Sequence, residues 1–518
     1  MRTMNNKKEN KAINHTKRNQ VKTFPIPFAL YKIKDGLIIN TNYLSETPEE
    51  EIIDQAIKFH LQGKISEAIK YYEHCLMKGF YDEKVFCNYG IILKNLGKIK
   101  EAELLQLKAI EIKPNYAEAH SNLGVIYKDK GKLKEAELSL MKAIEIRPDF
   151  ANAHNNLGII FNDLGKFQEA EISYLKAIEL KPDFAEPYYS LSLLKCSNEN
   201  KSWQNRLFSK NILNNKSKNE KIDIYFARSN VLHKEKNYIE SSKYLNLANQ
   251  IKLDIRPSNI KLRLEKSKRL LLESDKRETS KKEDVKKIKT IFIVGMPRSG
   301  STLLESIISM NFNVESLGEI NFLEESFLEE EQNEQGFNLA ELYWEKINTN
   351  STKSTIKTNK YLYNYQYAGI IATCIPNSKI IHCFRNPLDN ILSIYRAHFT
   401  IGNEYSSSLA DCANIYLDQE KIMDIYKKKY RSNIYDLNYD LLVSNPQEEI
   451  ISLISWLGWE WDDTYLSPHL NPRSISTASS VQVRSPINSK SIGGWKNYRD
   501  MLKPVIEILE KHEKYKKL

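Results

Sequence analysis

Residues 290–308 have the sequence TIFIVGMPRSGSTLLESII, which combines three structural signals in a short span. Thr290 to Gly295 form a β-branched run that is typical of a buried parallel strand. Met296 to Gly300 indicate a tight turn, and the residues from Ser301 to Ile308 have helical spacing. A strand, a glycine-containing turn and a helix start direct backbone N–H groups and the positive helix end at one point. This sequence therefore predicts an α/β domain with a parallel sheet and an anion site.

The turn resembles a P-loop but departs from it at one decisive position. Ser301 stands where a nucleotide triphosphatase needs its lysine, and no clear acidic residue is available to hold Mg²⁺. A kinase or ATPase is therefore disfavoured. A purely structural turn is the other reading, but the polar residues Arg298, Ser299 and Thr302 crowd this turn and favour a bound anion.

A second strand followed by a turn occurs at residues 379–393, where Arg385, Pro387 and Ser393 follow the run KIIHCF. Together with PRSGSTLLE, this pattern resembles the sulfotransferases that use 3′-phosphoadenosine 5′-phosphosulfate (PAPS), most closely the tyrosylprotein-type enzymes. The resemblance covers about 288–510. It implies that Arg385, by a bidentate fork, and Ser393, from a helix start, bind the 3′-phosphate of the donor. The 5′-phosphosulfate would lie in the first turn, against Arg298, Ser299, Gly300, Ser301 and Thr302.

The same resemblance implies the catalytic residues of an in-line transfer that needs no metal. Glu319, after Gly318, would accept the proton of the acceptor hydroxyl, although it could equally be one solvated carboxylate among several. Lys360 and Arg298 would neutralise charge on the leaving group; Leu362 stands where the family has proline. Tyr439 and Ser479 would contact the donor, or else be a core tyrosine and a loop serine.

The first half of the chain repeats with a period of 34 residues, as tetratricopeptide repeats do. Glycine, alanine and proline recur at that shift, at Gly90, Gly124, Gly158, Ala102, Ala136, Ala170, Pro114, Pro148 and Pro182. Small residues are expected where the two helices of a repeat touch, and proline is expected where the second helix ends. We predict an all-α solenoid in front of the α/β domain.

Asparagine also recurs at this period, at Asn88, Asn122 and Asn156 (the asparagine ladder). The repeats resemble those of the peptide O-GlcNAc transferases, in which such a ladder lines the groove. The ladder could pair with the backbone of a polypeptide on the concave face, or these residues could merely cap or space helices. The repeats could equally dock a partner protein or mediate self-association as a homodimer.

These patterns divide the chain into four parts. We expect a basic, partly disordered segment at 1–48 and a repeat array at 49–256, with clear repeats at 49–184 and a degenerate unit at 222–255. A charged helix and linker follow at 257–289, and the sulfotransferase-like domain occupies 290–518.

Composition limits the partners. The formal net charge is +10, but the 66 acidic residues are interleaved with the basic ones, which indicates a solvated surface and no nucleic-acid partner. The six cysteines form no C-x-x-C pair, so we expect reduced thiols and no metal site. Neither a signal-like nor a membrane-spanning apolar run is visible, and we expect a soluble cytoplasmic protein with no membrane partner.

Three functions follow from these patterns. The first is a PAPS-dependent sulfotransferase that acts on an acceptor hydroxyl, with tyrosine in a polypeptide as one candidate. The second is a repeat scaffold whose PAPS-binding domain is inactive. The third, a peptide glycosyltransferase, rests on the repeats alone and has no support after residue 290.

Overall fold

The computed structural model describes residues 48–195, 202–277, 289–332, 338–348, 356–399, 402–471, 473 and 480–516. Ser479 and residues 1–47 of the predicted basic segment lie outside these ranges. The chain divides between Tyr71 and Tyr72 into two compact units. The first unit contains helix α1, Glu49–Leu61, and most of α2, Ile65–Met77, in which the rings of Phe59 and Tyr71 pack 5.2 Å apart.

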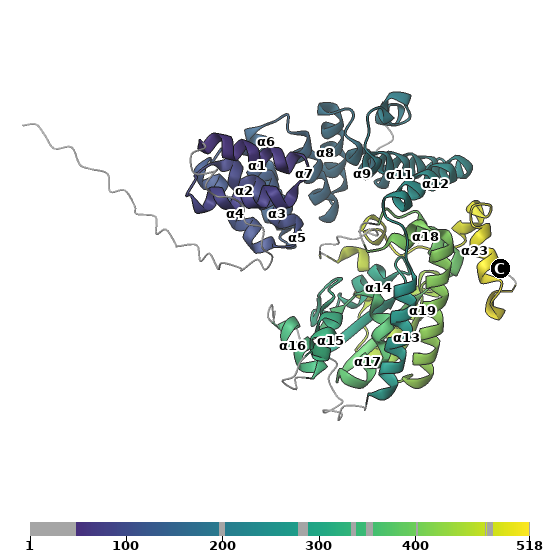
Figure 1. The fold of residues 1–518 in the computed structure, drawn as a ribbon. Helices are drawn as coiled ribbons and strands as arrows, with labels where there is room; N and C mark the ends of the chain where they lie inside the picture. The colour runs from purple at the N-terminus through teal and green to yellow at the C-terminus, as the bar shows by residue number, and fades with distance from the viewer. Residues whose placement is uncertain are drawn as a thin grey trace, which may run out of the picture. The chain divides into compact units, whose positions relative to one another are not determined.

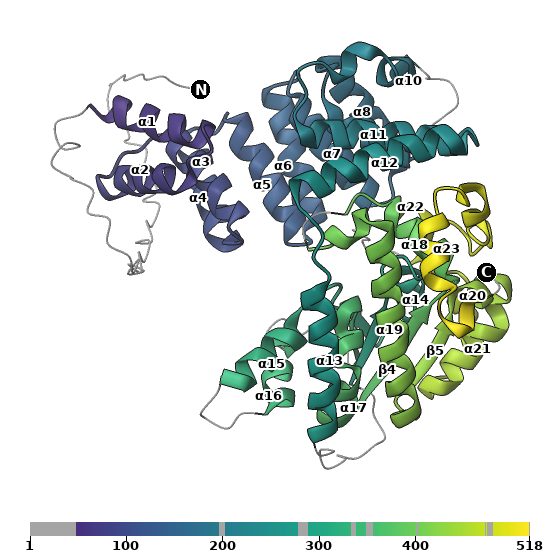
Figure 2. The ribbon, with the colours of Figure 1, turned by 45° about the vertical axis from the view of Figure 1, so that its right-hand side comes forward.

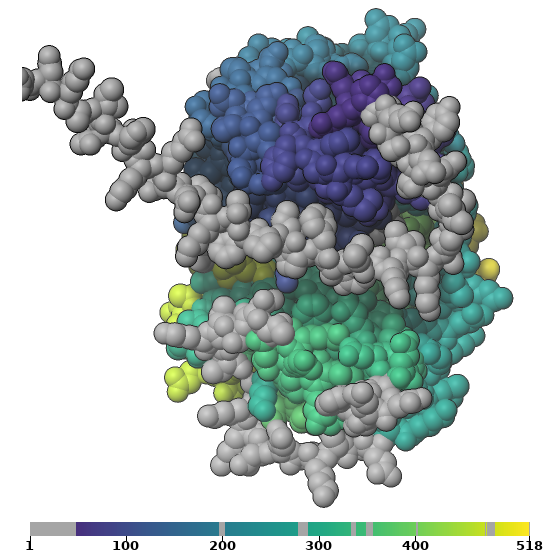
Figure 3. Space-filling model, turned by 60° about the vertical axis from the view of Figure 1, so that its left-hand side comes forward, coloured from purple at the N-terminus to yellow at the C-terminus, as the bar shows by residue number. Residues whose placement is uncertain are grey.

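The second unit begins with three helix pairs that follow the predicted period. Helices α3, α5 and α7 begin at residues 83, 117 and 151, so each starts 34 residues after the one before. The pairs are α3 (Glu83–Asn95) with α4 (Ile99–Ile112), α5 (Ala117–Asp129) with α6 (Leu133–Ile146), and α7 (Ala151–Asp163) with α8 (Phe167–Leu180). Their side chains form a continuous surface in the space-filling view (Figure 3). The predicted helical solenoid is confirmed.

The recurring glycines lie where the two helices of a pair come closest. A Cβ atom on Gly124 would lie 2.6 Å from Cγ of Leu140 on the partner helix, and one on Gly158 would lie 2.6 Å from the ring of Tyr174. Ala136, the equivalent small residue on the second helix, is fully buried. Larger residues at these positions would force the helices apart, which explains the repeat in physical terms.

Within the described residues, four α-helices and one 3₁₀ turn follow the regular pairs. They are α9 (Ala185–Leu193), α10 (Ser202–Leu207), the 3₁₀ turn η2 (Lys210–Leu213), α11 (Lys218–Lys234) and α12 (Tyr238–Ile255). A capping box starts α11, because the side chain of Ser217 accepts a hydrogen bond from the Glu220 amide and the Glu220 carboxylate accepts one from the Ser217 amide. The pair α11–α12 corresponds to the predicted degenerate unit.

The C-terminal domain is built on a five-stranded parallel sheet with the order β2-β3-β1-β4-β5. The strands are β1 (Thr290–Gly295), β2 (Val314–Ser316), β3 (Ile356–Asn359), β4 (Ser378–Phe384) and β5 (Ile434–Asn438). The strand β1 is central and fully buried, as its β-branched run predicts. This sheet, behind the helical repeats, confirms the predicted fold class.

Helices cover both faces of the sheet. Ile291 and Ile293 face α14 (Ser301–Ile308), α20 (Tyr439–Ser444) and α21 (Pro446–Leu457). Phe292 and Val294 face the opposite layer, which includes α13 (Lys261–Lys276), α17 (Ala368–Cys374) and α19 (Leu409–Lys429). Figures 1 and 2 show α13, α17 and α19 side by side over this face. Leu270 of α13 is fully buried there, so the predicted charged helix is part of the domain's own helical layer.

The remaining described elements connect these layers. They are α15 (Phe322–Gln332), α16 (Leu339–Asn348), η3 (Leu362–Tyr367), α18 (Pro387–Tyr395), η4 (Glu404–Ser407), η5 (Asp463–Leu466), η6 (Pro468–Leu470), α22 (Ser480–Val483), η7 (Gly494–Tyr498), α23 (Lys503–Leu509) and η8 (Glu513–Tyr515). None of the described helices has the length and apolar character needed to span a membrane.

The second unit contains one apolar cluster that joins the last repeat-like pair to the α/β domain. Phe226 of α11 and Leu245 of α12 are fully buried in it, together with Ile391 of α18, Ile415 of α19 and Leu509 of α23. These two helices therefore share a hydrophobic core with the C-terminal domain.

Candidate functional site

The first turn, Pro297–Thr302, joins β1 to α14 and buries its polar side chains. Ser299, Ser301 and Thr302 are each at most 6% exposed. Gly300 precedes the helix in the left-handed conformation with φ +97°, and a Cβ atom there would collide with the ring of Tyr439. The hydroxyl of Ser299 is buried and has no hydrogen-bond partner within the described residues. A buried donor without a partner is costly, so this turn fits an anion that accepts from Ser299.

The second turn joins β4 to α18 and contains Arg385. The guanidinium of this buried residue donates to the carbonyl of Ser491 at 2.8 Å and lies 4.7 Å from the centroid of the Tyr439 ring. Its Nε atom is 3.9 Å from Oδ1 of Asp440, and neither of these two atoms has a hydrogen-bond partner among the described residues. Arg385 is thus fixed in place and retains donor capacity for a phosphate.

The sheet brings the two turns together, because β1 and β4 are parallel neighbours with Gly295 opposite Cys383. Arg298 Nε donates to Ser393 Oγ at 3.1 Å, and Asn390 Nδ2 donates to the carbonyl of Pro297 at 3.0 Å. The two motifs that the sequence places far apart therefore form one site.

One detail of the prediction is wrong. Ser393 lies in the last turn of α18 and not at a helix start, because Asn386 caps the helix and Pro387 occupies its first position. The serine still points to the first turn through its bond with Arg298.

Positive charge is concentrated where the two turns meet. Burial, and then the charges of Arg385 and Arg396, lower the pKa of Arg298 to about 10. Arg298 also donates to Oε1 of Gln482 at 2.9 Å. Cations that repel one another in a partly buried space are the expected surroundings of a bound polyanion, whose charge would relieve that repulsion.

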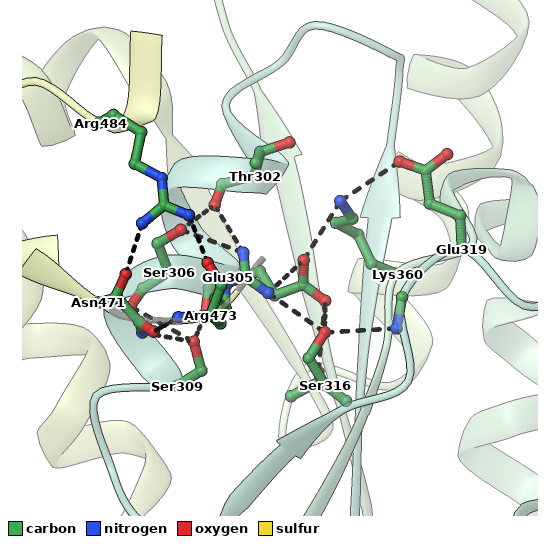
Figure 4. A network of polar contacts seen from close by, with 12 residues as sticks. Thr302, Glu305, Ser306, Ser309, Ser316, Glu319, Lys360, Asn471, Arg473 and Arg484 are labelled. Carbon is green, nitrogen blue, oxygen red and sulfur yellow. Dashed lines mark hydrogen bonds and ion pairs between the residues drawn. The ribbon is translucent and has the colours of Figure 1, made fainter. Parts of the chain in front are cut away.

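Lys360 and Glu319 form an ion pair with each other (Figure 4). Lys360 follows β3 and is only 2% exposed, and its ammonium is 3.3 Å from Oε1 of Glu319. The Lys360 amide donates to the carbonyl of Gly318 at 2.9 Å, which holds the loop with Glu319 against the end of β3. The Glu319 side chain is 56% exposed, so an incoming acceptor can reach it.

The structure also brings in residues that the sequence reasoning missed. Glu305 of α14 is buried and binds both Lys360 and Arg473. Asp440 accepts from the amide of Asn386 at 2.7 Å and thereby supports the second turn. Glu305 could have been found, because it lies one helical turn after Ser301 within the quoted motif. Arg473 belongs to no motif, and no sequence signal identified it.

The other predicted residues fall into two groups. Tyr439 lies between the two turns, and its hydroxyl is 2.9 Å from Oγ of Ser491. Ser479 lies outside the described residues. The asparagine ladder is on the repeats, at the equivalent position of α3, α5 and α7, and all three side chains are half-buried.

One ladder residue lines a small cavity. Asn122 lies with Lys94, Asn95 and Gln106 around a space of about 170 Å³ between neighbouring repeats. Its Nδ2 atom already donates to Sγ of Cys87 at 3.2 Å, so part of its hydrogen-bonding capacity is used within the array.

The site is formed by two neighbouring turns that follow the parallel strands β1 and β4, and comparison with known proteins gives the family of this domain. Residues 290–463 match the model of the sulfotransferase family. Residues 90–131, 126–165 and 151–184 match tetratricopeptide repeat models. The chain therefore carries a sulfotransferase-family domain behind tetratricopeptide repeats.

Individual relatives are more distant. An uncharacterized protein of Aquifex aeolicus (strain VF5) is 31% identical over 254 residues, which are 44% of this chain and 33% of that protein. A putative protein-tyrosine sulfotransferase of Caenorhabditis briggsae is 24% identical, over 40% of this chain and 80% of its own length. The protein-tyrosine sulfotransferase of Drosophila melanogaster is also 24% identical, over 40% of this chain and 46% of its own. The chain thus spans a third to a half of two of these relatives.

Solved structures match parts of the chain. A crystal structure of MamA is 22% identical and covers 35% of this chain and 96% of its own, with a TM-score of 0.26. The structure titled Functional Characterization of Pseudomonas Aeruginosa pilF is 15% identical and covers 44% of this chain and 82% of its own, with a TM-score of 0.27.

Proposed function

We propose that this protein is a PAPS-dependent sulfotransferase that moves a sulfuryl group to an acceptor hydroxyl. The observation that carries the proposal is the meeting of the two turns, in which Arg298 of the first binds Ser393 of the second at 3.1 Å. A donor with phosphate groups at both its 5′ and 3′ positions needs two such turns side by side.

The residues of each turn have separate parts in holding the donor. The unpartnered hydroxyl of Ser299 and the helix start at Gly300, Ser301 and Thr302 would bind the 5′-phosphosulfate. Arg385 and Ser393 would bind the 3′-phosphate. The Tyr439 ring, packed between Gly300 and Arg385, would support the nucleotide, and we keep Ser479 as a further candidate contact.

The donor supplies the sulfuryl group, and the protein handles the proton and the charge. As the acceptor oxygen bonds to sulfur, Glu319 takes the hydroxyl proton, and the bond from sulfur to the bridging phosphate oxygen breaks. Arg298 and Lys360 neutralise the charge that develops on that oxygen. These two protein cations provide the neutralisation, so the proposed reaction includes no metal.

A polypeptide is the acceptor that we propose, with tyrosine as its reacting residue. Helical-repeat arrays bind extended chains on their concave faces, and the asparagine ladder offers amide groups at a regular spacing. The cavity at Asn122 could receive one side chain of such a polypeptide. The relatives named as protein-tyrosine sulfotransferases agree with this choice.

The test is transfer of label from sulfur-radiolabelled PAPS to proteins of a cell lysate, with parallel titrations of adenosine and uridine nucleotides. We expect labelled protein bands, and binding of adenosine 3′,5′-bisphosphate that weakens when the 3′-phosphate is removed. Binding of the bisphosphate without any transfer would indicate the inactive scaffold. Binding of uridine nucleotides alone would indicate a glycosyltransferase.

A further inference from the structure

A carboxylate buried behind the first turn is not explained by donor binding. Glu305 lies on α14, one helical turn after Ser301, and its side chain is 2% exposed. Its Oε1 atom accepts from Ser316 Oγ at 2.6 Å. Its Oε2 atom lies 3.2 Å from the ammonium of Lys360 and 2.9 Å from NH1 of Arg473. Every oxygen of this carboxylate is therefore engaged, as Figure 4 shows.

The charges around Glu305 alternate along a row. The order is Arg473, Glu305, Lys360 and Glu319, and only the last of these is largely exposed. Burial opposes ionisation of Glu305, but the charges of Lys360 and Arg473 outweigh it and hold the pKa of Glu305 below its usual value. A carboxylate partner of this kind offsets the cost of burying the ammonium of Lys360.

We propose that Glu305 is a positioning residue for sulfuryl transfer, which holds the ammonium of Lys360 away from complete pairing with Glu319. This inference rests on the proposed function. The ammonium lies 3.2 Å from Glu305 and 3.3 Å from Glu319, so the two carboxylates share it as an ion-pair partner. Without Glu305, the ammonium would pair with Glu319 alone. That movement would withdraw the cation from the leaving group and occupy the carboxylate that has to accept a proton.

A purely structural role for Glu305 makes a different prediction, because Glu305 also holds Arg473. Arg473 has further bonds to Ser306 Oγ at 3.1 Å and to Ser316 Oγ at 3.2 Å, which tie this side chain to α14 and β2. If holding Arg473 were the whole role of Glu305, removing either residue would lower activity equally.

The chain offers a matched control one strand away. Glu315 of β2 pairs with Lys357 of β3, directly opposite in the sheet, in the same kind of ion pair. Glu315→Gln therefore makes the identical chemical change at an ion pair outside the row of charges.

The kinetic experiment compares three variants of the full chain. For Glu305→Gln, kcat should fall roughly 10- to 100-fold, the range typical of lost positioning, while the KM for PAPS stays within about twofold. Arg473→Gln should lose less, and Glu315→Gln should match the wild type. Equal losses in Glu305→Gln and Arg473→Gln, or a rise in KM with unchanged kcat, would overturn the inference.

A second readout does not depend on activity. Labelling with a lysine-acylating reagent, followed by mass spectrometry, should modify Lys360 faster in Glu305→Gln than in the wild type, and Lys357 faster in Glu315→Gln. If the wild type transfers no sulfate, yet Lys360 is labelled faster in Glu305→Gln than in the wild type, the proposed function fails. The positioning of Lys360 by Glu305 then still stands. If Lys360 is labelled equally fast in the wild type and in Glu305→Gln, the positioning of Lys360 by Glu305 is refuted. Should Glu305→Gln not fold, Glu305→Asp keeps the charge and lengthens the pair, and it should give a smaller loss in the same direction.

Discussion

Glu319 and Lys360 divide the proposed chemistry between a reachable carboxylate and a buried ammonium. Their side chains are 3.3 Å apart, yet 56% of the glutamate is exposed and only 2% of the lysine. This asymmetry suits their parts, since a base has to meet a changing acceptor, whereas a cation that stabilises the leaving group acts best where water is excluded.

Glu319→Gln tests the base. Because the amide cannot accept a proton, kcat should fall about 10²- to 10⁴-fold, while the affinity for adenosine 3′,5′-bisphosphate, measured by calorimetry, should not change. Glu325→Gln, an exposed neighbour on α15, is the control and should match the wild type. An unchanged rate in Glu319→Gln would exclude the residue as the base.

Arg298→Lys tests whether the first turn needs a planar fork or only a positive charge. Arg298 uses two nitrogen atoms, one toward Ser393 and one toward Gln482, and an ammonium cannot reproduce both directions. The affinity for the bisphosphate should weaken by roughly tenfold, equivalent to the loss of about one charge-assisted hydrogen bond. Arg431→Lys, in an exposed turn after α19, should leave the affinity unchanged, and an unaltered affinity in Arg298→Lys would show that charge alone is sufficient.

At the scale of elements, α11 and α12 belong to two structures at once. They follow the repeats in the chain, but they bury Phe226 and Leu245 in the apolar cluster of α18, α19 and α23. Asn249 of α12 donates to the carbonyl of Tyr395 at 3.0 Å, at the end of the helix that carries Ser393. This pair lacks the glycines of the regular repeats, and it packs on the domain.

Two fragments test this dual role. Residues 289–518 lack α11, α12 and α13, so the fragment would expose apolar surface that they cover, and we expect it to aggregate and to bind a hydrophobic dye. A fragment starting at Ser217, the cap of α11, should be monodisperse and bind adenosine 3′,5′-bisphosphate. Equal behaviour of both fragments in size-exclusion chromatography would contradict this view.

Local patterns predicted the elements well, because strand and repeat signals depend on neighbouring residues. The strand β1 has the predicted bounds. The misplaced start of α18 was avoidable, since Asn386 and Pro387 are a readable start signal. Arg473 was not predictable, because its bond to Thr302 spans 171 residues and depends on the folded chain. The burial of Leu270 was hidden by the charged residues around it.

At the scale of the whole second unit, the hydrogen-bonded residues Arg396, His233 and Tyr498 (the polar seam) lie beside the shared apolar cluster. Arg396, just after α18, donates to Nε2 of His233 on α11 at 3.1 Å, and His233 Nδ1 lies 2.8 Å from the Tyr498 hydroxyl. An arginine can only donate, so His233 accepts at Nε2 and must be neutral. The ring of Tyr238 and the charge of Lys234 also face it.

This seam predicts how stability depends on pH. Burial, together with the charge of Arg396, lowers the pKa of His233 to about 3, whereas the unfolded chain has the ordinary value of 6.5. Between these values the unfolded state binds a proton that the folded state refuses. The contribution of His233 is therefore complete above about pH 6.5 and is lost as the pH falls toward 3.

The measurement is the free energy of unfolding by urea from pH 7.5 to pH 4.5, for the wild type and for His233→Gln, whose amide accepts from Arg396 without titrating. The wild type should take up one more proton on unfolding than the variant across this interval, so its stability falls more steeply with acid. His512→Gln, at an exposed histidine near the C-terminus, should retain the wild-type slope. Parallel slopes for the wild type and His233→Gln would mean that His233 can be protonated in the folded protein. The bond from Arg396 would then not hold the last helix pair to the domain.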